Sequence, residues 1–165
     1  PTYTPELVEA MGTLANGADI LTPNLTEAAI ILGEPIGDDW CGTNISDAEA
    51  ARMIDALVAK GAKHVVLKGI QREGESVIRN FVGGVDCDMF EAANEYLPYM
   101  LHGTGDVFAS TLLAAVMAGS NLAEATAFAA DFTADAMLIS AKQPNFEDRG
   151  VSFEPLLGKV TALLG

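Results

Sequence analysis

The sequence has few basic residues: 9 Lys and Arg stand against 23 Asp and Glu among its 165 residues, so the formal net charge is −14. A charge of this sign and size argues against a nucleic-acid duplex or an anionic membrane surface as a general partner. It does not exclude a small anion, because a local nest of backbone N–H groups can bind one against the overall field.

Cysteine and long apolar runs are also scarce. The two cysteines, Cys41 and Cys87, are far apart in the chain. This excludes a disulfide framework and the usual zinc-ligand spacing, and it favours a reducing, cytoplasmic location. No run approaches the roughly 20 apolar residues that span a bilayer, so we expect no membrane partner. The P-loop and Gly-x-Gly-x-x-Gly fingerprints of nucleotide-binding proteins are both absent.

The chain begins with Pro1 rather than Met, and its first residues form a helix-start sequence. We therefore expect residues 1–165 to be the C-terminal portion of a longer protein, with an N-terminal part missing. Half of the residues are apolar, which is enough for the core of a single domain over 1–165.

Capping signals and apolar spacing predict helices that alternate with short strands. The predicted helices cover residues 5–16, 24–32, 47–60, 107–118, 121–142 and 154–164, the first with an apolar face of Leu7, Met11 and Leu14. The predicted strands cover 18–21 and 63–68, followed by a hairpin of 76–82 and 85–91 joined by Gly83-Gly84; residues 34–44 are predicted to form a loop. This order predicts an α/β layered fold with a mostly parallel central sheet.

The strongest local signal is His102-Gly103-Thr104-Gly105-Asp106, directly before a very apolar helix. Two glycines around a small residue let the backbone turn tightly and expose its N–H groups, and the helix adds its positive N-terminal end. Such a turn suits a phosphate, and Asp106 could serve there as a general base for a hydroxyl. The structural alternative is a plain helix start, with Asp106 complementing the helix dipole.

Two other polar features follow predicted strands. Asn24 and Glu27, after Thr22-Pro23, could hold Mg²⁺ through waters, although both could equally be helix-capping residues. Lys68, before Gly69, could reach a phosphate, or it could be a solvated lysine at a strand end. Because a parallel sheet brings such strand ends to one edge, we expect these features and the glycine turn to converge there.

The order of these motifs resembles that of pyridoxal/pyridoxamine kinases of the ribokinase-like (PfkB) superfamily. The resemblance rests on residues 20–28, on Val66-Leu67-Lys68-Gly69 and on residues 102–110, and it is supported by the closing residues 145–156. It implies a ribokinase-like layered sandwich. It also implies phosphorylation of the 5′-hydroxymethyl group of a vitamin B6 vitamer by ATP and Mg²⁺, in a protein that is a homodimer at full length.

The resemblance also assigns roles to single residues. Asp106 matches the catalytic base, Gly103 to Gly105 match the anion hole over the transferred phosphoryl group, and Glu27 matches a metal-positioning residue. The positions that it places against the nucleotide are Asn24, Glu27, Lys68, Leu101, Gly103, Thr104 and Gly105.

Two alternatives remain open on the sequence alone. The nucleotide-side motifs are shared within the superfamily, so the substrate could instead be hydroxymethylpyrimidine or a sugar. The chain could also be a non-catalytic module that binds ATP on a kinase-like scaffold, because the missing N-terminal part would hold most of the substrate pocket.

Overall fold

Helices and strands alternate along the chain in a computed structural model that describes residues 4–35 and 45–164. In order, the elements are α1 (Pro5–Met11), β1 (Ile20–Leu21), α2 (Leu25–Leu32), α3 (Asp47–Ala59), β2 (His64–Gln71), β3 (Val77–Gly84), β4 (Cys87–Glu95), α4 (Thr104–Met117), α5 (Leu122–Ser140), α6 (Phe146–Arg149), η1 (Glu154–Leu156), α7 (Leu157–Thr161) and η2 (Ala162–Leu164). They belong to two units, one up to Glu91 and one from Ala92 onward.

The four strands form one sheet in the order β1-β2-β3-β4. β1 pairs with β2 in parallel, with Ile20 opposite His64, whereas β2 pairs with β3 in antiparallel register. The α/β class is therefore confirmed, but the sheet of the described residues is mixed rather than mostly parallel. The reason is the short turn after β2, which returns the chain directly alongside it, and a short turn can join only antiparallel strands.

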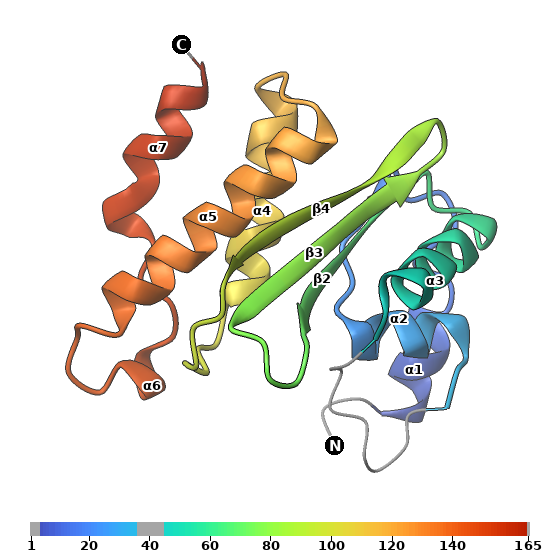
Figure 1. The fold of residues 1–165 in the computed structure, drawn as a ribbon, viewed down its shortest axis with the longest axis horizontal. Coiled ribbons are helices and arrows are strands. Elements are labelled where there is room, and N and C mark those ends of the chain that lie inside the picture. Colours follow the sequence, from blue (N-terminus) through green and yellow to red (C-terminus); the bar gives the residue numbers. More distant parts are fainter. Residues whose placement is uncertain (1–3, 36–44, 165) are drawn as a thin grey trace. The chain divides into compact units, whose positions relative to one another are not determined.

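The first unit packs α2 and α3 against one face of the sheet (Figure 1). The predicted apolar face of α3 is confirmed, because its residues Ala50, Met53, Ile54 and Leu57 are buried. They share a core with Leu67 and Phe81 from the strands and with the buried side of α2. Burial of these apolar side chains is the main stabilising contribution to the unit.

The second unit is built on α4 and α5, which pack along one another (Figure 1). Small residues at their buried positions, such as Ala115, Ala125 and Ala129, permit close approach of the two helices. Within the described residues, no helix has both the length and the apolar character that crossing a membrane requires.

The predicted ends of two strands, β2 and β3, are wrong. In both cases glycine lies within the strand, whereas the prediction treated glycine as a sign that the strand had ended. Gly83 and Gly84 lie inside β3 rather than in the hairpin turn, which is formed after them and includes Asp86 at φ 54°. β2 continues past Lys68 and Gly69 to Gln71. Glycine is needed at position 84 because a Cβ there would lie 2.8 Å from His64 Cα, and closer still to the carbonyl oxygen of Lys63.

The predicted apolar face of the first helix is also partly wrong. Met11 is buried, but Leu7 and Leu14 are 45% and 56% exposed. α1 ends at Met11, so Leu14 follows the helix rather than continuing its face. Of the predicted loop 34–44, residues 36–44 lie outside the described part of the chain.

The close approach at Gly84 generates a stability prediction. Replacing Gly84 by Ala places a methyl group against the backbone of β2, so the free energy of unfolding should fall by about 1–3 kcal/mol. Urea unfolding measures this change. Gly158→Ala is the control, because a Cβ at that helical position meets open space and should leave stability unchanged or slightly raised. Equal unfolding midpoints for Gly84→Ala and the unaltered chain would contradict the packing argument.

Candidate functional site

Asn24 and Glu27 form a capping box where the chain leaves β1 and begins α2. The Glu27 N–H donates to Asn24 Oδ1, and the Asn24 N–H donates to Glu27 Oε2, each over 2.8 Å. These bonds satisfy backbone N–H groups that the start of a helix leaves without intrahelical acceptors. The capping alternative is thus observed for both residues. The Glu27 side chain is not fully enclosed by the box, because 28% of it stays exposed.

Lys68 reaches the same place from β2. Its ammonium donates to the carbonyl oxygen of Thr22 over 2.5 Å and lies 3.5 Å from Glu27 Oε2. Its backbone N–H donates to the carbonyl of Pro23, in an isolated parallel bridge between Lys68 and Asn24. The side chain is only 16% exposed, so it is not a freely solvated lysine. Asn24, Glu27 and Lys68 are therefore brought together, and we call these three residues the lysine group.

The position of Lys68 within its strand differs from the prediction. Lys68 lies inside β2 at a break in register between Leu67 and Ile70, rather than at the end of the strand. Gly69 follows it with φ 76°, a left-handed conformation that glycine adopts without strain. The strand therefore continues past Lys68 through a β-bulge, which is a common way to redirect one side chain out of a sheet.

The second group is the turn Leu101–Asp106, which we call the glycine turn. Gly103 is the N-cap of α4 with φ 90°, and it has no side chain to accept a hydrogen bond from the helix. The first intrahelical bond runs from Val107 N to the carbonyl of Gly103 over 3.0 Å. The N–H groups of the preceding residues, Thr104 to Asp106, lie ahead of that bond and are directed out of the helix start. This arrangement can bind an anion.

The side chains of the glycine turn differ in burial: one is packed inside and another is open to solvent. Leu101 is buried, and its carbonyl accepts a weak hydrogen bond from the Thr104 hydroxyl over 3.4 Å. Asp106 is exposed, and its carboxylate has no hydrogen bond or ion pair within the described residues. A carboxylate in the first turn of a helix, without a partner and open to solvent, is available to accept a proton from a ligand.

Residues far along the chain support this turn, and the sequence analysis missed them. The N–H of Val151 donates to the carbonyl of His102 over 3.0 Å, and a Cβ at Gly150 would lie 3.1 Å from that oxygen. Gly150 also has φ 73°, so glycine is required there for both reasons. The sequence signal for this support was one residue, Gly150, in a stretch without a helical or strand pattern.

The lysine group belongs to the first unit of the chain and the glycine turn to the second. Each is assembled within its own unit. The expected convergence of both at one edge of the sheet stays a prediction.

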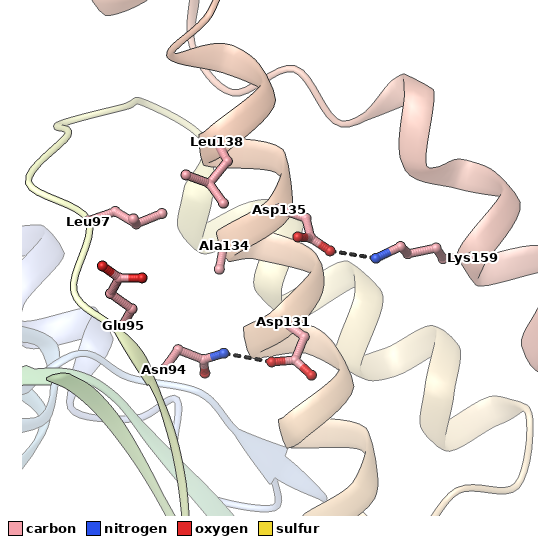
Figure 2. A pocket seen from close by; sticks show the side chains of 8 residues that line it. All are labelled: Asn94, Glu95, Leu97, Asp131, Ala134, Asp135, Leu138 and Lys159. Carbon is pink, nitrogen blue, oxygen red and sulfur yellow. Dashed lines mark hydrogen bonds and ion pairs between the residues drawn. The ribbon is translucent and has the colours of Figure 1, made fainter.

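A cavity of about 320 Å³ lies within the second unit, and none of the predicted site residues lines it (Figure 2). Asn94 Nδ2 donates to Asp131 over 2.6 Å, and the Lys159 ammonium pairs with Asp135 over 2.5 Å. Dashed lines mark both interactions in Figure 2. Both carboxylates that α5 contributes to the lining thus have partners. The described residues contain no group of three or more His, Cys, Asp or Glu side chains suited to a metal ion. No residue of the glycine turn lines this cavity.

Comparison with known proteins identifies what this chain is similar to. The sequence profile of the phosphomethylpyrimidine kinase family matches residues 1–150. The hydroxymethylpyrimidine/phosphomethylpyrimidine kinase of Rhizobium meliloti is 30% identical over 115 residues, which are 67% of this chain and 38% of that protein. Three further curated relatives have the same name, and one, from Pasteurella multocida, is the pyridoxal kinase PdxY at 27% identity. The chain spans less than half the length of these relatives.

The comparison with solved structures agrees with the comparison of sequences. A Bacteroides thetaiotaomicron protein assigned as a phosphomethylpyrimidine kinase, in a crystal form with pyridoxal, superposes with a TM-score of 0.85 at 25% identity. The match covers 96% of this chain and 55% of that one. The Staphylococcus aureus pyridoxal kinase in complex with AMP-PCP is also 25% identical, with a TM-score of 0.69 over 86% of this chain and 50% of that one. The resemblance to pyridoxal kinases of the ribokinase-like superfamily is thereby confirmed.

The two asparagine caps allow a direct test of how much the lysine group contributes to stability. Asn121 caps α5 through a capping box with Glu124 of the same design as the Asn24 box. Asn24→Ala and Asn121→Ala should each lower the free energy of unfolding by about 1 kcal/mol, and Asn24→Asp should restore most of the loss. Urea unfolding measures both. An Asn24→Ala variant as stable as the unaltered chain would show that Asn24 does not stabilise α2.

Proposed function

The chain belongs to the phosphomethylpyrimidine kinase family, and from that premise we propose that it transfers the γ-phosphoryl group of ATP to the hydroxymethyl group of a small heteroaromatic ring. The observation that carries the proposal is the glycine turn, where exposed N–H groups at the start of α4 adjoin an unpartnered Asp106. We further propose that residues 1–165 form the nucleotide-binding portion of one ribokinase-like domain.

The glycine turn is assigned the chemical step. The Asp106 carboxylate takes the proton of the substrate hydroxyl, whose oxygen forms a bond to the γ-phosphorus as the bond from that phosphorus to the bridging oxygen of ADP breaks. The N–H groups of Gly103, Thr104 and Gly105 donate to the phosphoryl oxygens, on which charge is spread during transfer. Because these donors are held by the helix and by the Val151 contact, they need no rearrangement as charge develops.

The lysine group is assigned to the phosphates and the metal ion of ATP. Lys68 supplies a cation that is already desolvated and held by Thr22 and Glu27. Mg²⁺ is usually bound by one or two carboxylates together with water and substrate phosphates, so the partly exposed carboxylate of Glu27 fits it. Bound there, Mg²⁺ would neutralise phosphate charge, while Asn24 fixes the position of the Glu27 carboxylate. Leu101 is assigned to the segment that covers the nucleotide.

The comparisons support two substrate classes. The four curated relatives at 30–34% identity are hydroxymethylpyrimidine/phosphomethylpyrimidine kinases, so we propose a hydroxymethylpyrimidine as the first candidate. A vitamin B6 vitamer, which the sequence resemblance implied, is the second, favoured by the Pasteurella relative and by the pyridoxal in the Bacteroides crystal. ATP as donor is supported by the AMP-PCP complex of the Staphylococcus kinase. A homodimer and a cytoplasmic location stay predictions.

Asp106→Asn tests the assignment of the base. In the natural protein that contains this sequence, the variant should bind MgATP with unchanged affinity, while kcat falls by about 10² to 10⁴-fold, the usual contribution of a positioned base. Turnover is measured by ADP release with hydroxymethylpyrimidine, pyridoxal and pyridoxamine. Asp55→Asn, an exposed carboxylate on α3, is the matched control and should leave kcat unchanged.

Each outcome of that experiment decides one part of the proposal. Full turnover in Asp106→Asn would remove Asp106 as the base. A preference for pyridoxal over the pyrimidine would reverse the order of the two substrate candidates. Binding of ATP without turnover on any hydroxymethyl compound would favour the non-catalytic alternative.

A further inference from the structure

At the β-bulge beside Lys68, two residues of β2 lie opposite one residue of β3. On one side of it Leu67 pairs with Phe81, and on the other Ile70 pairs with Arg79. Between these pairs β2 has two residues, Lys68 and Gly69, whereas β3 has one, Asn80. A β-bulge of this kind leaves the extra residue out of the strand ladder, so its backbone N–H has no strand carbonyl to bind.

Asn80 provides the missing acceptor. The Gly69 N–H donates to Asn80 Oδ1 over 3.1 Å, and Asn80 is only 6% exposed. A polar side chain this deeply buried in the middle of a strand is unfavourable unless it is hydrogen-bonded. Its bond here closes the gap that the bulge opens in the ladder, so Asn80 stabilises the bulged form of β2 against the regular one.

The form of the bulge determines where Lys68 points. Register places Val66 opposite Val82, so Lys68 and Asn80, each two residues further from that pair, lie on the same face of the sheet. From there the ammonium reaches Thr22 O and Glu27 Oε2. The neighbouring cation, Arg79, is paired with Glu75 and Glu91, and the hydrogen bond that its guanidinium donates to Glu75 raises its pKa above the ordinary value.

We infer that Asn80 is a positioning residue for nucleotide binding: by accepting the Gly69 N–H it holds the bulge that aims Lys68 at the phosphates. The inference rests on the proposed function, in which Lys68 meets ATP. Asn80 itself touches neither the nucleotide nor the reacting atoms, and it acts through Lys68.

Three substitutions separate positioning from stability. Asn80→Leu has a similar volume and no acceptor, whereas Asn80→Asp keeps an oxygen that can accept the Gly69 N–H. Phe81→Leu, one residue along β3 in the core on the opposite face, is the control for a general loss of stability. Amide hydrogen exchange at Gly69 and the rate of Lys68 acetylation, both by mass spectrometry, report the bulge without any nucleotide.

In the full natural protein, Asn80→Leu should raise the exchange rate at Gly69 and weaken MgATP binding by about five- to tenfold, as expected for the loss of one buried hydrogen bond. Asn80→Asp should restore most of both. Phe81→Leu should lower the unfolding midpoint without changing the affinity for MgATP. In a Lys68→Met background, Asn80→Leu should have no further effect on that affinity, because the two residues act in series.

Unchanged MgATP affinity in Asn80→Leu, or an equal loss in Phe81→Leu, would overturn the inference. An effect that persists in full when Lys68 is absent would overturn it too, because Asn80 would then act by another route. If the unaltered protein binds no ATP, the proposed function fails. The exchange and acetylation rates then still decide whether Asn80 holds the bulge and Lys68.

Discussion

The need to satisfy backbone N–H groups organises both candidate groups in this chain. Wherever a helix begins or a strand bulges, donors are left without regular acceptors, and burying them unpaired is costly. At α2 and α5 an asparagine and a glutamate accept them, and at the bulge Asn80 does so. At α4 the N-cap is Gly103, which has no side chain to offer. The donors there are left for solvent or a ligand, and this separates a binding position from a structural one.

In the lysine group, helix capping and the proposed binding role do not exclude each other. Asn24 and Glu27 complete a capping box, yet that box is what holds the Glu27 carboxylate 3.5 Å from the Lys68 ammonium. Asn121 and Glu124 form the same box on α5, and within the described part of the chain no lysine forms an ion pair with Glu124. The cap fixes the start of the helix in both places, and at α2 the strand β2 also brings the Lys68 ammonium to it.

Local signals in the sequence were enough to predict most helices and to single out the residues that form the lysine group and the glycine turn. Ser46, Asn24 and Asn121 are caps that act over three residues, and the apolar face of α3 follows from helical spacing alone. The bulge could not be predicted, because it depends on which residue of β3 lies opposite Lys68, and register is a tertiary property. Gly84 was misassigned to a turn for the same reason: its role is the close passage of β2, which no local pattern records.

The physics of the glycine turn also accounts for the mixed names among the relatives. An anion site made of backbone N–H groups depends on chain geometry rather than on particular side chains, and transfer from ATP needs the same geometry whether the acceptor ring is a pyrimidine or a pyridine. In the proposed mechanism, Lys68 and the N–H groups of the glycine turn face the phosphates, and Asp106 faces the hydroxyl of the hydroxymethyl group that both kinds of acceptor carry, so none of them contacts the ring. Similarity over these residues therefore follows the phosphoryl transfer that both kinds of kinase share.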